Sequence, residues 1–156
     1  MKKKWKSILF WVLASEAVGA LAGWISREGS KLYAEMAAKP PLSPPDWLFP
    51  VAWGILYALM GIGAGLIASQ PESSGRSRAL NLMVTQLVVN FFWPLLFFNA
   101  GAYGFSLLWL LILLVLVILM TVAFYRENKW AGLLQIPYIL WLLFAAYLNA
   151  GVWLLN

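Results

Sequence analysis

The sequence contains neither cysteine nor histidine among its 156 residues. Without cysteine the chain can form no disulfide, no thiolate nucleophile and no cysteine metal site. Without histidine it also lacks the usual general base near neutral pH and the commonest ligand for zinc and copper. We therefore expect no metal site and no bound cofactor, since even a haem iron would have to take Met, Tyr or Lys as its axial ligand.

Charged residues are also scarce, at 11%, whereas hydrophobic residues make up 63% of the chain. A soluble domain of this size does not need so much apolar surface, so the solvent around most of the chain is lipid. Five apolar runs are each about long enough to cross a hydrocarbon core of about 30 Å as a helix. They cover residues 7–25, 49–68, 80–98, 103–124 and 130–155. The sequence thus predicts an all-α integral membrane protein, a single five-helix transmembrane bundle over residues 1–156, with the lipid bilayer as a partner and no nucleic acid.

The basic residues are divided unequally between the two sides of this predicted bundle. One side carries eight of them, namely Lys2, Lys3, Lys4, Lys6, Arg76, Arg78, Arg126 and Lys129. The other side carries three, namely Arg27, Lys31 and Lys39. Basic loops stay in the cytoplasm. We therefore expect a multi-pass protein of the cell membrane with a cytoplasmic N-terminus and an outside C-terminus.

The loop over residues 27–48 is longer than the roughly 12–15 residues at which an unstructured connection becomes unusual, so we expect it to be functional or partly structured. Residues 31–38 have the pattern of a short helix. Four prolines between Pro40 and Pro45 then keep the chain extended. Within this stretch, Ser43 has the pattern of an N-cap and Pro44 that of the first residue of the second span.

Small residues recur every four positions in two of the spans, as in Gly19 and Gly23 of the first and Gly61 and Gly65 of the second. This spacing lets helix backbones approach closely. The sequence leaves two interpretations open, namely packing between helices of one chain and the seam of a homodimer. Glu16, in the middle of the first span, is expected to face the bundle interior, a cavity or a partner, because an acid in lipid is costly.

Three spans each carry aromatic and amide side chains on one helical face. The second span carries Trp53, Tyr57 and Met60; the third carries Gln86, Asn90, Trp93 and Phe97; the fifth carries Tyr138, Trp141, Ala145 and Asn149. Pro94 is expected to kink the third span beside this face. The fourth span is nearly uniform from Leu107 to Met120, and the pattern predicts that it mostly faces lipid.

Tryptophans at span ends, such as Trp5, Trp24, Trp130 and Trp153, fit the aromatic belts at membrane surfaces. Trp53, Trp93 and Trp141 lie further inside and share their faces with amides or a tyrosine. Unpaired amides in hydrocarbon cost free energy, so an apolar bundle does not need Asn90 and Asn149 for packing alone. The pattern favours an aromatic-walled pocket with a few polar anchors for a flat, mostly apolar ligand.

Three segments carry a resemblance to a known family. They read KPPLSPPDWLFPVAWGILYALMG (39–61), QLVVNFFWPLLFF (86–98) and IPYILWLLFAAYLNAGVWLLN (136–156). In these segments the chain resembles the translocator protein/tryptophan-rich sensory protein (TspO) family. The resemblance implies a five-helix membrane bundle, often dimeric, with a pocket that the first loop caps. It also implies binding of porphyrins such as protoporphyrin IX, and in some members of sterols or drug-like molecules.

The resemblance assigns ligand-binding roles to residues of the three segments. Tyr138 is added because it lies on the aromatic face of the fifth span, and Lys39 because it could pair with a carboxylate of the ligand. The full set of residues predicted to bind the ligand is Lys39, Trp47, Trp53, Tyr57, Asn90, Trp93, Tyr138, Trp141, Ala145 and Asn149. Trp53 and Trp141 correspond to the tryptophans invoked for light-driven porphyrin breakdown in some bacterial members. Leu42 stands where the family commonly has an aromatic residue, which weakens that reaction. The animal sterol motif is incomplete around Asn149, which weakens high-affinity cholesterol binding.

The leading expectation is a membrane receptor or binding protein for tetrapyrroles, with a macrocycle that is metal-free or lacks a strong axial ligand. A light-dependent protoporphyrin-degrading enzyme is the first alternative, with Trp53 and Trp141 as its candidate catalytic residues. A small-molecule transporter is the second. It is disfavoured because the fold is small and the sequence shows neither an internal repeat nor a relay of charged residues. A homodimer through Gly19, Gly23, Gly61 and Gly65 is the expected protein partner.

Overall fold

The computed structural model describes residues 2–156, which fold into a helical bundle without strands. Within this range five helices are long and apolar enough to cross a membrane. The all-helical, five-span prediction is therefore confirmed. The elements are α1 (Lys2–Ile25), α2 (Arg27–Met36), α3 (Leu48–Ala68), α4 (Ser74–Pro94), the π-helix η1 (Leu95–Asn99), α5 (Tyr103–Glu127), α6 (Lys129–Leu133) and α7 (Ile136–Leu155).

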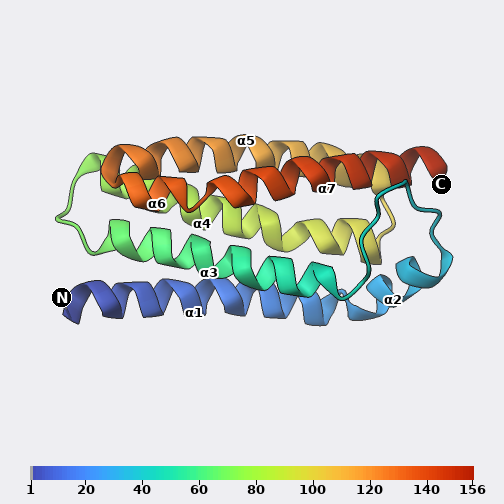
Figure 1. The fold of residues 1–156 in the computed structure, drawn as a ribbon, viewed down its shortest axis with the longest axis horizontal. Helices are drawn as coiled ribbons and strands as arrows, with labels where there is room; N and C mark the ends of the chain where they lie inside the picture. The colour runs from blue at the N-terminus through green and yellow to red at the C-terminus, as the bar shows by residue number, and fades with distance from the viewer. Residues whose placement is uncertain (1) are drawn as a thin grey trace.

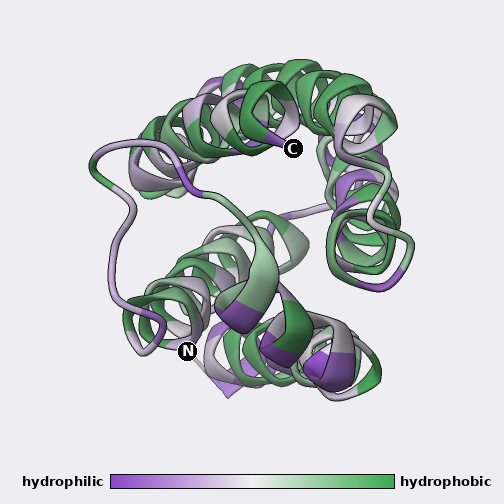
Figure 2. Ribbon diagram, turned by 90° about the vertical axis from the view of Figure 1, so that its right-hand side faces the viewer, coloured by the Kyte–Doolittle hydropathy of each residue, from purple (hydrophilic) through white to green (hydrophobic). Residues whose placement is uncertain are grey.

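The five long helices run roughly along one axis, and the two chain termini lie at opposite ends of it (Figure 1). Helix α1 packs antiparallel against α3, while α5 lies between α4 and α7. The short helix α2 and the loop that follows it lie at the end where α7 finishes. The ribbons are mostly hydrophobic along the bundle, with hydrophilic segments mainly at helix ends and in loops (Figure 2), as a protein surrounded by lipid requires.

Helix starts follow the capping residues more closely than the apolar runs. Helix α4 begins at Ser74, ahead of the apolar run, because the Ser73 side chain accepts a hydrogen bond from the Arg76 amide at 3.1 Å. Asn128 caps α6 in the same way, accepting from the Trp130 amide at 3.0 Å. Local polar residues therefore extend two membrane helices beyond their hydrophobic stretches.

The predicted start of the second span at Ser43 is wrong. Helix α3 begins at Leu48, and Ser43 instead donates its hydroxyl hydrogen to the Pro40 carbonyl at 2.7 Å within a turn. The physical reason lies in the next two residues, because a residue that precedes a proline is disfavoured in the helical region, and Pro44 precedes Pro45. The predicted short helix near residues 31–38 is present as α2, shifted towards the N-terminus.

Pro94 changes the type of the helix. It ends α4, and the chain continues as the π-helix η1, in which the Ala100 amide donates to the Leu95 carbonyl five residues earlier at 3.0 Å. Proline has no amide hydrogen to continue the regular ladder, and single π turns are often found where a helix lacks such a bond. The disturbance predicted at Pro94 therefore takes the form of a wider turn beside the aromatic face.

Helix α5 contributes a core face that the sequence did not reveal. One of its faces is buried along its whole length, through Ser106, Leu110, Leu113, Val117, Met120 and Phe124. The opposite face exposes leucine, isoleucine and valine side chains to the bilayer. Most of its residues are not buried, as the sequence predicted, but which of its faces packs in the core could not be predicted, because a uniformly apolar helix carries no pattern that distinguishes core from lipid.

Glycines allow α1 and α3 to touch. A Cβ atom on Gly61 or Gly65 would collide with the backbone of Val12 or Ile8, respectively, and one on Gly19 would collide with the ring of Tyr57. These three glycines therefore serve packing within one chain, which was the first of the two interpretations. Gly23 has open space beside it. A homodimer remains a prediction.

Candidate functional site

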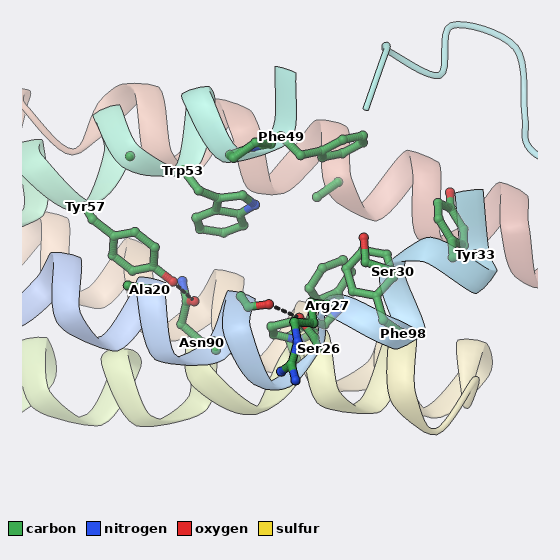
Figure 3. A pocket seen from close by; sticks show the side chains of 18 of the residues that line it. Ala20, Ser26, Arg27, Ser30, Tyr33, Phe49, Trp53, Tyr57, Asn90 and Phe98 are labelled. Atoms are coloured by element: carbon green, nitrogen blue, oxygen red, sulfur yellow. Dashed lines mark hydrogen bonds between the residues drawn. The ribbon is translucent and has the colours of Figure 1, made fainter. Parts of the chain in front are cut away.

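A cavity of about 560 Å³ lies inside the bundle near its α2 end (Figure 3). This volume is in the range of pockets that hold drug-sized molecules. Its walls come from α1, α2, α3, α4, α5 and α7, so the cavity exists only in the assembled bundle. The predicted site residues that line it are Trp53, Tyr57, Asn90, Trp93 and Ala145.

Trp53 is the central aromatic residue of this cavity. Its ring lies 5.6 Å from that of Tyr57, 6.1 Å from that of Tyr138 and 6.4 Å from that of Trp141, measured between centroids. The contacts with Tyr138 and Trp141 are edge-to-face, which is a favourable geometry for aromatic pairs. Trp93 stacks on Phe97 at 4.9 Å on another wall. The cavity therefore offers large, flat apolar surfaces held in place by neighbouring rings.

Trp141 lies beside the main cavity and does not line it. It borders a side cavity of about 30 Å³, which Trp53, Trp93, Ala145 and Asn149 also border. The indole N–H of Trp141 is buried and has no hydrogen-bond acceptor. A buried donor without a partner costs about 1–3 kcal/mol. This N–H is thus a donor beside the side cavity that no protein group satisfies.

Buried polar groups close the inner end of the cavity. The hydroxyl of Tyr57 donates to Asn90 Oδ1 at 2.6 Å, and Asn90 Nδ2 donates to the hydroxyl of Tyr138 at 2.6 Å. Figure 3 shows the first of these bonds, with the Tyr57 ring and the Asn90 amide pointing towards each other. Tyr138 donates in turn to Gln86 Oε1 at 2.7 Å. Tyr138 and Gln86 line neither cavity, so the chain of bonds leads from the cavity into the core.

Asn149 is already engaged by protein groups. Its Oδ1 accepts from the indole of Trp93 and from the hydroxyl of Ser106, both at 3.1 Å. Its Nδ2 donates to the Tyr103 carbonyl at 2.8 Å. The amide therefore fixes the orientation of Trp93 and borders the side cavity, whereas Asn90 reaches the main cavity. The two predicted amide anchors thus occupy different environments.

The two loop residues predicted for the site line neither cavity. Lys39 donates its ammonium group to the Ala34 carbonyl at 2.9 Å and lies 5.2 Å from the ring centroid of Tyr33. The Trp47 side chain is 63% exposed at the start of α3. Their ligand-binding roles remain predictions that require the loop to move.

The loop is fastened to α7. Asn156 exchanges two hydrogen bonds with the backbone of Ala38, at 3.1 and 2.8 Å, and the Tyr147 hydroxyl donates to the Pro41 carbonyl at 2.6 Å. Pro40 is buried against Gly151, where a Cβ would collide with its ring. These contacts fix the course of the loop at this end of the bundle.

Several cavity residues were missed by sequence reasoning. The group comprises Gly19, Gly23, Ser26 and Ser30, with Arg27 and Tyr33 next to them and Asp46 from the loop. Glu16 lines the same cavity, which is one of the places where the sequence predicted it. From Glu16 to Ser30 these positions recur every three or four residues, which is one helical face. That spacing was readable in the sequence, but the break between α1 and α2 lies inside it.

Tyr33, on α2, keeps its proton unusually strongly. The pKa of Tyr33 is raised from 10.0 to about 12, chiefly by burial and also by the nearby Tyr103 and Asp46. Its ring lies edge-on to Phe97 and Phe98 at centroid distances of 5.1 and 5.3 Å. At neutral pH this wall of the cavity therefore carries an uncharged phenol.

These features define an all-helical, multi-pass membrane protein with an aromatic-lined cavity inside its bundle. The model of the TspO/MBR family matches residues 11–154 of the chain. The chain therefore belongs to the TspO/MBR family, which confirms the resemblance found in the sequence.

Individual relatives are similar over most of their length. The chain is 37% identical to the Tryptophan-rich protein TspO of Archaeoglobus fulgidus, covering 93% of this chain and 94% of the relative. It is 33% identical to the human Translocator protein, covering 98% and 92%, respectively. It is 36% identical to the Protein CrtK of Rhodobacter capsulatus, covering 76% and 74%.

Proposed function

We propose that this protein is a receptor or binding protein of the cell membrane for a flat, largely apolar tetrapyrrole of the protoporphyrin IX type. The observation that carries the proposal is the cavity of about 560 Å³, walled by Trp53, Trp93 and Phe49 near one end of the bundle. Indole and phenyl faces suit a planar macrocycle. Six helices contribute residues to the walls around a ligand in this position.

The unpaired indole N–H of Trp141 supports the same proposal. An acceptor atom at the edge of a macrocycle could satisfy this buried donor, which no protein group does. Trp141→Phe removes the donor together with the five-membered ring of the indole. We expect this variant to remain folded, because the void left by the smaller ring is offset in part by removal of the unpaired donor, and to bind protoporphyrin IX several-fold more weakly. Trp5→Phe, at an exposed position of α1, is the matched control and should leave binding unchanged.

The test is a titration of the purified protein with protoporphyrin IX in the dark, with tryptophan quenching as the readout. Saturable quenching that Trp53→Ala weakens and Trp5→Ala does not would support binding in the cavity. Equal effects of the two substitutions, or no saturation, would contradict it.

A second candidate function is light-dependent breakdown of the bound porphyrin. The observation that favours it is the 6.4 Å centroid separation of Trp53 and Trp141, two indoles that border the side cavity together. Such a reaction would oxidise the macrocycle with dioxygen as the oxidant. Protein-dependent bleaching under light in air, absent under argon and lost in Trp53→Phe, would support it. A porphyrin spectrum that stays stable under light would exclude it.

A further inference from the structure

Two methionines fix the direction of a buried amide in the core. Gln86 Nε2 lies 3.4 Å from the sulfur atoms of both Met60 and Met83. A thioether sulfur can accept a hydrogen bond but cannot donate one. The N–H side of the amide must therefore face the two sulfurs, and Gln86 Oε1 must face Tyr138. Turning the amide over would place its oxygen against two acceptors.

The orientation of the Gln86 amide determines which group is the donor in every hydrogen bond between Gln86 and the cavity. Because Gln86 Oε1 can only accept, Tyr138 must use its one hydroxyl hydrogen for this bond. The Tyr138 oxygen is then free only to accept, so Asn90 presents its Nδ2 to it and its Oδ1 to Tyr57. Tyr57 must in turn donate its hydroxyl hydrogen to Asn90 Oδ1. Each bond in the series fixes the donor of the next.

The consequence appears at the cavity wall, where Tyr57 has no hydrogen left to donate and its hydroxyl oxygen offers only lone pairs. We propose that Gln86 is a positioning residue which, through Tyr138 and Asn90, makes Tyr57 a hydrogen-bond acceptor at the inner end of the cavity. At the Tyr57 hydroxyl, the cavity then favours molecules with an N–H or O–H group over molecules of the same shape with a carbonyl. This inference rests on the proposed binding function and adds a chemical preference to it. Gln86 itself is fully buried and touches no ligand.

Removing Gln86 should reverse the direction of the remaining bonds. In Gln86→Leu the Tyr138 hydrogen is free to turn to Asn90 Oδ1, so the amide turns over and its Nδ2 donates to Tyr57. The Tyr57 hydroxyl hydrogen then points into the cavity. The same two inter-residue bonds persist with exchanged donors, so the variant changes selectivity in a way that simple loosening of the core would not.

Two tricyclic probes of matched shape test this prediction. Carbazole carries an N–H where 9-fluorenone carries a carbonyl, and calorimetry gives the Kd of each. We expect the unmodified protein to prefer carbazole by about fivefold, which is the worth of one net hydrogen bond. We expect Gln86→Leu to remove this preference for carbazole or to turn it into a preference for 9-fluorenone. We expect Tyr57→Phe to bind the two probes with nearly equal Kd values. Gln135→Leu, which removes another buried amide outside this chain of bonds, should leave the ratio unchanged.

A spectroscopic measurement tests the direction without any ligand. The infrared C–O stretch of a phenol differs between a donating and an accepting hydroxyl, and the difference spectrum between the unmodified protein and Tyr57→Phe isolates that of Tyr57. We expect a donating phenol in the unmodified protein and a shifted band in the Gln86→Leu background. Met60→Leu combined with Met83→Leu keeps Gln86 and nearly the same volume but removes both sulfurs, and it should broaden the band and bring the probe ratio towards one.

The outcomes separate this inference from the proposed function. Saturable porphyrin binding with a probe ratio and a Tyr57 band that ignore Gln86→Leu would overturn the inference alone. Absence of binding by protoporphyrin IX and both tricycles would overturn the proposed function, while the Tyr57 band would still decide the direction of the hydrogen bonds.

Discussion

The indole N–H of Trp93 donates to Asn149 Oδ1 at 3.1 Å, joining α4 to α7 beside the cavity. Ser106 donates to the same oxygen, so the Asn149 side chain is already hydrogen-bonded to protein groups without a ligand. We expect Asn149→Leu to lower the free energy of unfolding by roughly 2 kcal/mol, because it leaves the Trp93 indole N–H without an acceptor, whereas Ser106 keeps the Tyr103 carbonyl at 3.0 Å. Porphyrin affinity should fall with it, since Trp93 loses its fixed orientation. Thermal unfolding in detergent and the quenching titration measure the two effects.

Trp93→Phe is the matched control for that prediction. It keeps an aromatic ring and leaves Asn149 its bond to Ser106, so its loss of stability should be smaller than that of Asn149→Leu. Equal stability of Asn149→Leu and the unmodified protein would contradict the role given to this amide.

The glycines of α1 and α3 should respond very differently to the same substitution. Gly61→Ala places a methyl group against the backbone of Val12, which cannot move aside as a side chain could. We expect a loss of about 2 kcal/mol or more in the free energy of unfolding, as for other overpacked cores. Gly23→Ala meets open space and should cost no stability, because alanine is the better helix former. Similar melting temperatures for the two variants would refute the packing shown between α1 and α3.

The fastening of the loop to α7 should control its mobility more than the stability of the bundle. Asn156→Ala removes both bonds to Ala38, which lie at an exposed position where hydrogen bonds contribute little to folding. We expect the Ala38 amide to exchange with deuterium at least several-fold faster while the melting temperature stays nearly constant. Asn99→Ala, at the same end of the bundle but bonded to Ile25, is the control. Unchanged exchange at Ala38 would mean that the loop is held elsewhere.

Alkaline pH should destabilise the protein through Tyr33. Its pKa is raised to about 12 in the folded state from an ordinary value of 10.0, so its stabilising contribution is complete below about pH 10 and is lost as the pH rises through about pH 12. We expect Tyr33→Phe to lose less stability than the unmodified protein across this window, with parallel curves below it. Melting temperatures measured over the alkaline range check this. Parallel curves over the whole range would show that Tyr33 is not buried against its aromatic neighbours.

The sequence predicted the class of fold well because lipid imposes a simple rule on it. Each apolar run had to become a helix, and the runs were separated by polar turns. Where local geometry decides, prediction was weaker. The pair of prolines at Pro44 and Pro45 moved the start of α3 to Leu48. The uniform apolar surface of α5 concealed which of its faces is buried.

The site was predicted in part for a similar reason. Trp53, Tyr57, Asn90 and Trp93 share helical faces that period alone could identify, and they line the main cavity. The unpaired indole N–H of Trp141 could not be predicted, because it depends on contacts between helices and the pattern of a single helix does not contain them.

The close contact of α1 and α3 has a consequence for how the protein enters the membrane. Both spans leave the ribosome before α4, α5 and α7, and the fit of Gly61 and Gly65 against α1 needs no residue of those later helices. The pair can therefore settle as a hairpin during synthesis. The bonds among Tyr57, Asn90 and Tyr138 also need α7, so the inner end of the cavity is completed only after α7 has been made.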